Sequence, residues 1–295
     1  MSGPDPTTHF SAEAPERVGV LGGGRMGAGI AHAFLLAGSQ VVVVERDEAA
    51  AAAAGERIRT SLLRSVERGS TDRTLATLEG ALETSTDAAV FADAGLVVEA
   101  VPEDRALKLA SLHRIEAVVT RTAAIASNTS SISIDDLGVD LAHPERFLGL
   151  HFFNPVPASS LVEVVVGAST NQELVDDARG WVVALGKTAV VVADAPGFAS
   201  SRLGVAIALE AIRMLEEGVA TAADIDAAME LGYRHPTGPL RTTDIVGLDV
   251  RLGIAEELHA KLGERFAPPQ LLRDLVADGH LGRKTGRGFY EWSEG

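Results

Sequence analysis

The sequence predicts an α/β fold in which a doubly wound, mainly parallel sheet is followed by an all-helical region. Up to about residue 195, short apolar runs alternate with longer segments of helical periodicity, as in sheets covered by helices on both faces. Beyond residues 194–197 the sequence shows helical patterns and no convincing strand. We therefore expect a disordered leader over residues 1–15, an α/β domain over 16–195 and a helical domain over 196–295.

Each expected element has a local signal. Strands are expected where short apolar runs end at turn residues, at 17–21, 41–44, 96–101, 123–127, 147–151, 161–166 and 188–192. Helices are expected where apolar residues recur at helical spacing, at 26–37, 49–69, 105–119, 200–217, 221–229, 248–262 and 269–278. The segment from Thr221 to Asp224 has the Thr-x-x-Asp pattern of a capped helix start.

Composition excludes several classes of protein. The 295 residues are 46% hydrophobic, which is enough for a sizeable core. A net charge of −15 argues against non-specific nucleic-acid binding, because that requires a basic surface. The absence of cysteine excludes disulfides and thiolate ligands, and no His/Asp/Glu spacing indicates a metal site. No apolar run is long enough for a membrane span, and residues 1–16 lack a signal-like segment, so we expect a cytoplasmic protein.

A glycine-rich turn follows the first expected strand and opens the first expected helix. Its G-x-G-x-x-G pattern comprises Gly22, Gly23, Gly24, Arg25, Met26 and Gly27. In this context the pattern is typical of a Rossmann-like dinucleotide site, where the glycines permit a tight turn and the helix N-terminus meets the pyrophosphate. Glu45 ends the second strand, where a carboxylate can bind both ribose hydroxyls of NAD. Because Arg46 follows Glu45, binding of NADP in place of NAD stays an alternative. The alternative without a cofactor is a glycine-rich turn that lies beside a surface glutamate.

His151 ends an apolar strand, at the edge where open α/β sheets bind their ligands. A histidine suits the proton transfer that accompanies hydride transfer from an alcohol. Glu163 is an isolated acid within an apolar run, so its burial requires a partner. Pairing with the histidine would fix the tautomer of the ring and stabilise the imidazolium. The alternative is a structural histidine. Ser130, in the polar run 127–131, is either a ligand or a helix N-cap.

From about residue 17 to residue 292, the sequence resembles the 3-hydroxyacyl-CoA dehydrogenase family. The resemblance is carried by residues 18–31 (VGVLGGGRMGAGIA), 98–104 (VEAVPED), 126–131 (ASNTSS), 146–157 (RFLGLHFFNPVP), 161–165 (LVEVV), 194–198 (DAPGF), 212–219 (IRMLEEGV), 224–229 (DIDAAM), 245–249 (IVGLD) and 281–290 (LGRKTGRGFY). It implies an NAD-binding domain, a helical dimerisation domain, and hydride transfer between NAD and C3 of an L-3-hydroxyacyl-CoA.

The resemblance also implies roles for individual residues. His151 matches the catalytic histidine, Glu163 its carboxylate partner, and Ser130 a serine that binds substrate and cofactor. The remaining matches are residues that contact NAD, namely Glu103, Lys108, Asn154 and Lys284.

This chain departs from the family where the acyl group and its carrier should bind. Ser201 stands where the family has an asparagine near the catalytic histidine and the thioester. Ser160 and Glu67 stand where lysines are common, and Arg241 where a glutamate is usual. A helical face of Arg57, Ser61, Arg64 and Arg68 is either solvated or meets a pantetheine phosphate.

These departures leave three hypotheses. The first is a dehydrogenase of short-chain 3-hydroxyacyl-CoA. The second is a dehydrogenase of a polar unit, glyceryl or seryl, on an acyl carrier protein. The third, favoured least because His151 and Glu163 are present, is an NAD-binding relative without turnover.

Overall fold

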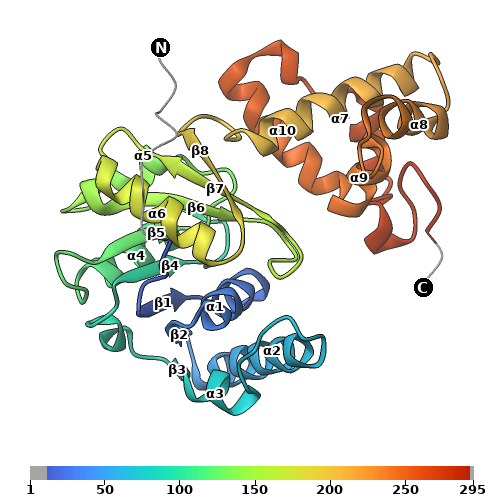
Figure 1. The fold of residues 1–295 in the computed structure, drawn as a ribbon. Helices are drawn as coiled ribbons and strands as arrows, with labels where there is room; N and C mark the ends of the chain where they lie inside the picture. Colours follow the sequence, from blue (N-terminus) through green and yellow to red (C-terminus); the bar gives the residue numbers. More distant parts are fainter. Residues whose placement is uncertain (1–11, 293–295) are drawn as a thin grey trace. The chain divides into compact units, whose positions relative to one another are not determined.

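The structure is a computed structural model that describes residues 12–292 (Figure 1). The chain divides into two compact units, Met1–Asp194 and Ala195–Gly295. Of the predicted leader, residues 1–11 lie outside the described residues. Its last residue, Pro15, accepts a hydrogen bond from the Ser39 hydroxyl at 2.7 Å.

The first unit is built on an eight-stranded sheet with the strand order β3-β2-β1-β4-β5-β6-β7-β8. All neighbouring strands are parallel except β6 and β7, which are antiparallel. The strands are β1 (Arg17–Leu21), β2 (Gln40–Val44), β3 (Leu82–Ser85), β4 (Leu96–Glu99), β5 (Ala124–Ser127), β6 (Phe147–Phe152), β7 (Leu161–Val166) and β8 (Thr188–Ala193). The predicted α/β class and mainly parallel sheet are confirmed.

Helices cover both faces of this sheet (Figure 1). They are α1 (Arg25–Ala37), α2 (Glu48–Glu67), α3 (Leu75–Gly80), α4 (Arg105–Glu116), α5 (Ile134–Gly138) and α6 (Gln172–Ala184). Side chains of α1, α2 and α6 share one hydrophobic core with Val20, Leu150, Val164 and their counterparts in the other central strands. Because successive strand residues point to opposite faces, the intervening residues point away from that core.

The second unit is helical. Its helices are α7 (Ser200–Glu216), α8 (Ala222–Tyr233), α9 (Pro239–Val246), α10 (Leu248–Leu262) and α11 (Gln270–Ala277). They surround a core that includes Val205, Leu209 and Leu258. The predicted capped start of α8 is present, because the Thr221 side chain accepts a hydrogen bond from the Asp224 amide at 3.2 Å. In this unit the described residues form isolated β-bridges but no strand, as the sequence predicts.

Several short or polar elements were not predicted. β3 pairs with β2 but places Glu83 and Thr84 in solvent, so it lacks an apolar pattern. The helices α3 and α5 have only six and five residues, too few to show a helical period. The eight-residue helix α9 was also not predicted, although α11 of the same length was. Helix α6, although long, was also not predicted. Among the described residues, no helix is long and apolar enough to cross a membrane.

Candidate functional site

The glycine turn joins β1 to α1 in a geometry that only glycine permits at two positions. Gly22 has φ +97°, and a Cβ on Gly27 would lie 1.8 Å from the Gly22 carbonyl oxygen. A Cβ on Gly24, by contrast, would meet nothing within 4 Å. Gly24 is also the N-cap of α1 and provides no capping side chain. The turn therefore leaves open space at a helix N-terminus, which fits the pyrophosphate of a dinucleotide.

Two side chains hold this turn: that of Glu45, which follows β2, and that of Arg57 on α2. The Glu45 carboxylate accepts hydrogen bonds from the Gly23 amide at 2.8 Å and the Arg46 amide at 3.1 Å. Arg57, on α2, donates to the Gly23 carbonyl at 2.6 Å. Arg46 pairs instead with Asp47 at 3.1 Å. Glu45 thus lies beside the turn, where a ribose diol is expected, and Arg57 is a structural contact of the turn rather than a purely solvated cation.

The predicted histidine–carboxylate pair is formed within one antiparallel hairpin. The register of β6 and β7 places His151 directly opposite Glu163, on the sheet face that points away from α1, α2 and α6. His151 Nδ1 lies 2.8 Å from Glu163 Oε2, and both side chains are buried. The Phe153 ring lies against the imidazole, with ring centroids 4.4 Å apart. With Nδ1–H donating to the carboxylate, Nε2 carries the lone pair that can accept a proton.

Ser130 lies in a loop organised by Glu103. One carboxylate oxygen of Glu103 accepts the Ser130 amide at 2.9 Å, the Ser131 amide at 3.0 Å and the Thr129 hydroxyl at 2.6 Å. The N-cap of α5 is Ser133, so Ser130 is not the helix cap that was the alternative. Burial alone would raise the pKa of Glu103, but the charge of Lys108 and these hydrogen bonds outweigh it and lower the pKa. An ionised Glu103 therefore fixes the Ser130 loop.

Lys108 is buried in an ion pair that the sequence analysis did not identify. Its ammonium donates to both oxygens of Glu99, at 2.9 and 3.1 Å, and lies 3.3 Å from Glu103. Glu99 also accepts the Ser127 hydroxyl at 2.6 Å. Burial raises the pKa of Glu99 and outweighs the opposing effect of Lys108. Glu99 could have been found by the argument used for Glu163, since it is also an isolated acid in an apolar run, here residues 96–101.

Residues 153–160 connect β6 to β7 and carry Asn154, which is exposed. Two contacts hold this loop. The Lys187 ammonium donates to the carbonyls of Val156, at 2.7 Å, and Ser159. Val156 is buried against α1, because a Cβ on Gly29 would lie 2.8 Å from Val156 Cβ. Burial lowers the pKa of Lys187. Lys187 gave no sequence signal, since its partners are backbone carbonyls.

The carboxyl ends of neighbouring strands bring most of the predicted residues of the first unit to one edge of the sheet. Gly22 follows β1, Glu45 follows β2, and Ser130 lies three residues after β5. Asn128, next after β5, accepts a hydrogen bond from the Phe152 amide at 2.9 Å and so ties its loop to the end of β6 beside His151. This is the edge at which open α/β sheets bind their ligands.

Two predicted site residues belong to the second unit. Ser201 is half-buried in the first turn of α7. Lys284 donates to both Asp249 oxygens at 2.6 and 2.7 Å, within its own unit, so its predicted contact with NAD is untested. Ser201 likewise stays a prediction.

The positions where this chain departs from the family have different surroundings. The Arg241 guanidinium lies over the rings of Tyr290 and Trp292, 4.8 and 5.2 Å from their centroids, which is a cation–π contact. Glu67 is exposed at the end of α2, and Ser160 is exposed before β7.

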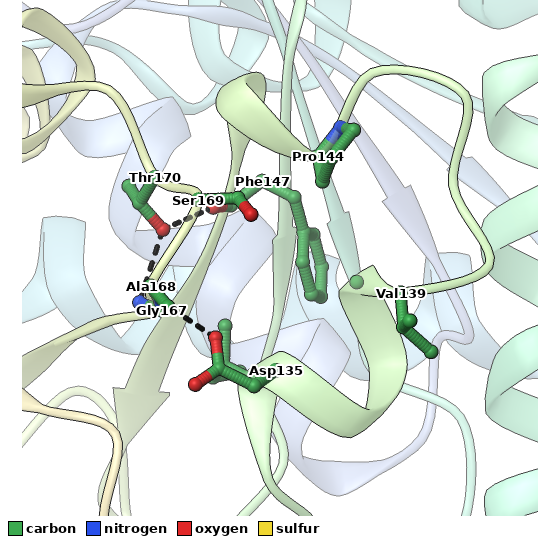
Figure 2. Close-up of a pocket in the computed structure, with 10 residues that line it drawn as sticks. Asp135, Val139, Pro144, Phe147, Gly167, Ala168, Ser169 and Thr170 are labelled. Carbon is green, nitrogen blue, oxygen red and sulfur yellow. Dashed lines mark hydrogen bonds between the residues drawn. The ribbon is translucent and has the colours of Figure 1, made fainter.

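A surface pocket of about 390 Å³ lies where Phe147 begins β6, at the end of the strand away from His151 (Figure 2). Two of its polar side chains, those of Asp135 and Thr170, already bind backbone groups of the chain. Asp135 accepts the Ala168 amide at 2.6 Å, and the Thr170 hydroxyl donates to the Phe147 carbonyl at 2.7 Å. The pocket is thus separate from the carboxyl edge where His151 lies. No cluster of His, Asp or Glu among residues 12–292 could hold a metal ion.

Comparisons with known proteins agree with this geometry. Residues 17–195 match the profile of the 3-hydroxyacyl-CoA dehydrogenase NAD binding domain, and residues 197–292 match that of the C-terminal domain. The 3-hydroxybutyryl-CoA dehydrogenase of Mycobacterium tuberculosis H37Rv is 43% identical over 95% of this chain and 100% of its own length. The probable 3-hydroxybutyryl-CoA dehydrogenase of Bacillus subtilis 168 is 38% identical, over 95% of this chain and 98% of its own.

Among solved structures, (S)-3-hydroxybutyryl-CoA dehydrogenase PaaH1 from Ralstonia eutropha superposes with a TM-score of 0.90 at 37% identity, covering 95% of this chain and 100% of its own. The resemblance inferred from the sequence motifs is therefore confirmed, and NAD is the cofactor. The chain belongs to the 3-hydroxyacyl-CoA dehydrogenase family and is an NAD-dependent oxidoreductase.

Proposed function

We propose that this protein transfers a hydride between NAD(H) and C3 of a short-chain 3-hydroxyacyl or 3-oxoacyl thioester. The observation that carries the proposal is the buried His151–Glu163 pair, at the same edge of the sheet as the glycine turn. Relatives named 3-hydroxybutyryl-CoA dehydrogenase support a four-carbon acyl group and CoA as the carrier.

The chain's own residues account for the proton. In the direction of oxidation, Nε2 of His151 accepts the proton of the 3-hydroxyl group, and Glu163 stabilises the imidazolium through the bond to Nδ1. Bound NAD⁺ supplies the hydride acceptor, so that C3 becomes a carbonyl carbon. In the direction of reduction, the imidazolium returns the proton to the carbonyl oxygen.

The other predicted residues orient the reactants. The Ser130 hydroxyl lies 3.4 Å from Glu103, a weak contact that it can exchange for one to the substrate. Ser201 is assigned to the thioester side of the substrate. Glu103, Lys108, Asn154 and Lys284 are assigned to NAD. We assign Lys108 an indirect role, since its ammonium is buried between two carboxylates.

One panel of substrates tests the function and the carrier. NADH oxidation is followed with acetoacetyl groups on CoA, pantetheine and acyl carrier protein, and NAD⁺ reduction with glyceryl and seryl units on the same carriers. We expect turnover with acetoacetyl-CoA. A strong preference for a polar unit on the carrier protein would favour the second hypothesis, in which Ser201, Ser160 and Glu67 reflect altered recognition. No NAD(H)-linked turnover with any thioester would refute the proposal.

We also propose that the protein is a cytoplasmic homodimer that associates through its helical unit. Supporting this, the unit exposes large apolar side chains on four helices, which is unusual unless another surface covers them. They are Leu203, Ile207, Leu231, Tyr233, Ile245, Val246 and Val250.

A further inference from the structure

The carboxyl end of β6 extends beyond its pairing with β5. The register between these two parallel strands ends with Ser127 opposite Gly149, whereas β6 continues to Phe152. His151 therefore lies two residues beyond the last pair with β5. On its other side β6 stays paired with β7, where His151 lies opposite Glu163. The strand end that carries the histidine is thus held by β7 but lies past the ladder with β5.

The Asn128 side chain binds this strand end from the side of β5. Its Oδ1 accepts a hydrogen bond from the Phe152 amide at 2.9 Å. Phe152 is buried, so its amide needs a partner within the protein. The backbone of Asn128 is itself fixed, since its amide donates to the Glu99 carbonyl at 2.8 Å. A side-chain acceptor on a fixed backbone therefore continues the contact between the two strands after their ladder has ended.

The loop that carries Asn128 also carries Ser130, two residues further on. This loop is bound to the segment that follows β4, because the Thr129 hydroxyl and the Ser130 amide both donate to Glu103, at 2.6 and 2.9 Å. Ser130 is thus positioned relative to β4, whereas His151 is positioned by its pairing with β7. The bond from the end of β6 to Asn128 connects these two groups.

We propose that Asn128 is a positioning residue that sets the distance between Ser130 and His151. The inference rests on the proposed function, in which the Ser130 hydroxyl and Nε2 of His151 act on one substrate. Catalysis by positioned groups is sensitive to placement, because a displacement of about 1 Å can reduce the rate by about 10²-fold. Since His151 and Glu163 are paired in one hairpin, loss of the Asn128 bond is expected to displace both together relative to Ser130.

Substitutions of similar size separate the hydrogen bond from the bulk of the side chain. Asn128→Leu removes the acceptor and is expected to lower kcat for the reduction of acetoacetyl-CoA by about 10²-fold. Asn128→Asp keeps an oxygen at the same place and is expected to recover most of the lost kcat. If Asn128→Leu does not fold, Asn128→Ala tests the same bond, because water can then reach the Phe152 amide, and the same fall in kcat is expected.

The matched control lies at the opposite end of the same strand. There the Thr170 hydroxyl donates to the Phe147 carbonyl at 2.7 Å and accepts a hydrogen bond from the Gly167 amide at 3.0 Å. Thr170→Val removes both bonds and is expected to lower Tm while kcat stays at the wild-type value. If Thr170→Val lowers kcat as much as Asn128→Leu does, general loosening of β6 explains both effects and the inference is overturned.

Fluorescence titration with NADH provides a measurement apart from turnover. Asn128→Leu is expected to bind NADH as tightly as the wild type, because it leaves the glycine turn unchanged, so the loss is confined to kcat. Wild-type kcat in Asn128→Leu, or no recovery of kcat in Asn128→Asp, would overturn the inference and leave the proposed function intact. Absence of NAD(H)-linked turnover in the wild type would instead refute the proposed function, on which the inference rests.

Discussion

His151 and Glu163 form the pair to which we assign the proton transfer of this protein. The carboxylate is buried and its oxygen lies 2.8 Å from Nδ1, so it selects the tautomer in which the opposite ring nitrogen is basic. Without Glu163, the ring could adopt either tautomer and the imidazolium would lose its counter-charge. Without His151, the buried carboxylate would lose the imidazole with which it pairs at 2.8 Å.

We expect His151→Ala and Glu163→Ala each to lower kcat by about 10²- to 10⁴-fold while NADH still binds, because general acid–base catalysis contributes that range. Steady-state kinetics and fluorescence titration with NADH measure the two effects. His143 and Glu145 provide a matched control, since they form an exposed pair at 3.1 Å. His143→Ala should leave kcat unchanged. Full activity in either catalytic variant would remove the pair from the mechanism.

His32 makes stability depend on pH. It is buried in α1, with Nε2 2.8 Å from the Ser65 hydroxyl. Burial first, then the charge of Lys187, lower its pKa below 6.5. Below pH 6.5 the imidazole of His32 is protonated in the unfolded chain but stays neutral in the folded protein. The free energy of unfolding therefore falls as the pH decreases from 6.5 toward the pKa of the folded state.

From about pH 7.5 to about pH 5.5, His32 is expected to account for up to about 1.4 kcal/mol of lost unfolding free energy. Urea denaturation at the two pH values measures this loss. In His32→Gln the loss should be smaller by that amount, whereas the exposed His113→Gln should behave as wild type. An identical pH dependence in His32→Gln would show that the ring is not the titrating group.

At the scale of elements, we assign dinucleotide binding to the junction between β1 and α1. Gly27 is needed for close packing, because any Cβ there collides with the Gly22 carbonyl, whereas Gly24 faces open space. We therefore expect the two glycines to be required for different reasons, Gly27 by the fold and Gly24 by the ligand.

Gly27→Ala is expected to displace the turn, lower the free energy of unfolding by several kcal/mol and abolish NADH binding at micromolar concentration. Gly24→Ala is expected to change the unfolding free energy by less than about 0.5 kcal/mol and still weaken NADH binding, because its methyl group enters the pyrophosphate space. Urea denaturation and NADH titration separate the two effects. Wild-type stability and affinity in Gly27→Ala would contradict the packing argument.

The sequence predicted helices and strands whose apolar residues recur regularly, and polar residues that stand out in an apolar run. It predicted Glu163 because an acid in an apolar run requires a partner. It did not predict that β7 runs antiparallel to β6, since a buried strand has the same apolar pattern in either direction. Lys187 was not identified, and Arg57 was assigned only to a solvated or phosphate-binding face, because their partners are backbone carbonyls, which have no signature in the side-chain sequence.

At the scale of the whole molecule, the two units divide the predicted residues. The glycine turn, His151, Glu163 and Ser130 belong to the first unit, and Ser201 and Lys284 belong to the second. The helical unit exposes the apolar side chains of Leu231 and Tyr233, with 84% and 76% of their surface in solvent.

Light scattering at micromolar concentration is expected to give twice the chain mass of 30.8 kDa. Leu231→Glu, on the helical unit, should shift the mass toward the monomer, because a charge cannot be buried in an apolar interface without a partner. Val139→Glu is the matched control, since Val139 is 73% exposed on the first unit. A monomeric wild-type protein would refute the homodimer.

In the hairpin of β6 and β7, different residues determine the geometry of the His151–Glu163 pair and the shape of the connecting loop. The distance between His151 and Glu163 is set by strand register, whereas the intervening residues 153–160 lie outside both strands. We expect insertions and substitutions in that segment to change which substrates bind, while the His151–Glu163 pair keeps its geometry. Directed evolution of substrate range should therefore find viable variants in residues 157–160. It should find few within either strand, where a one-residue slip turns Glu163 to the opposite face.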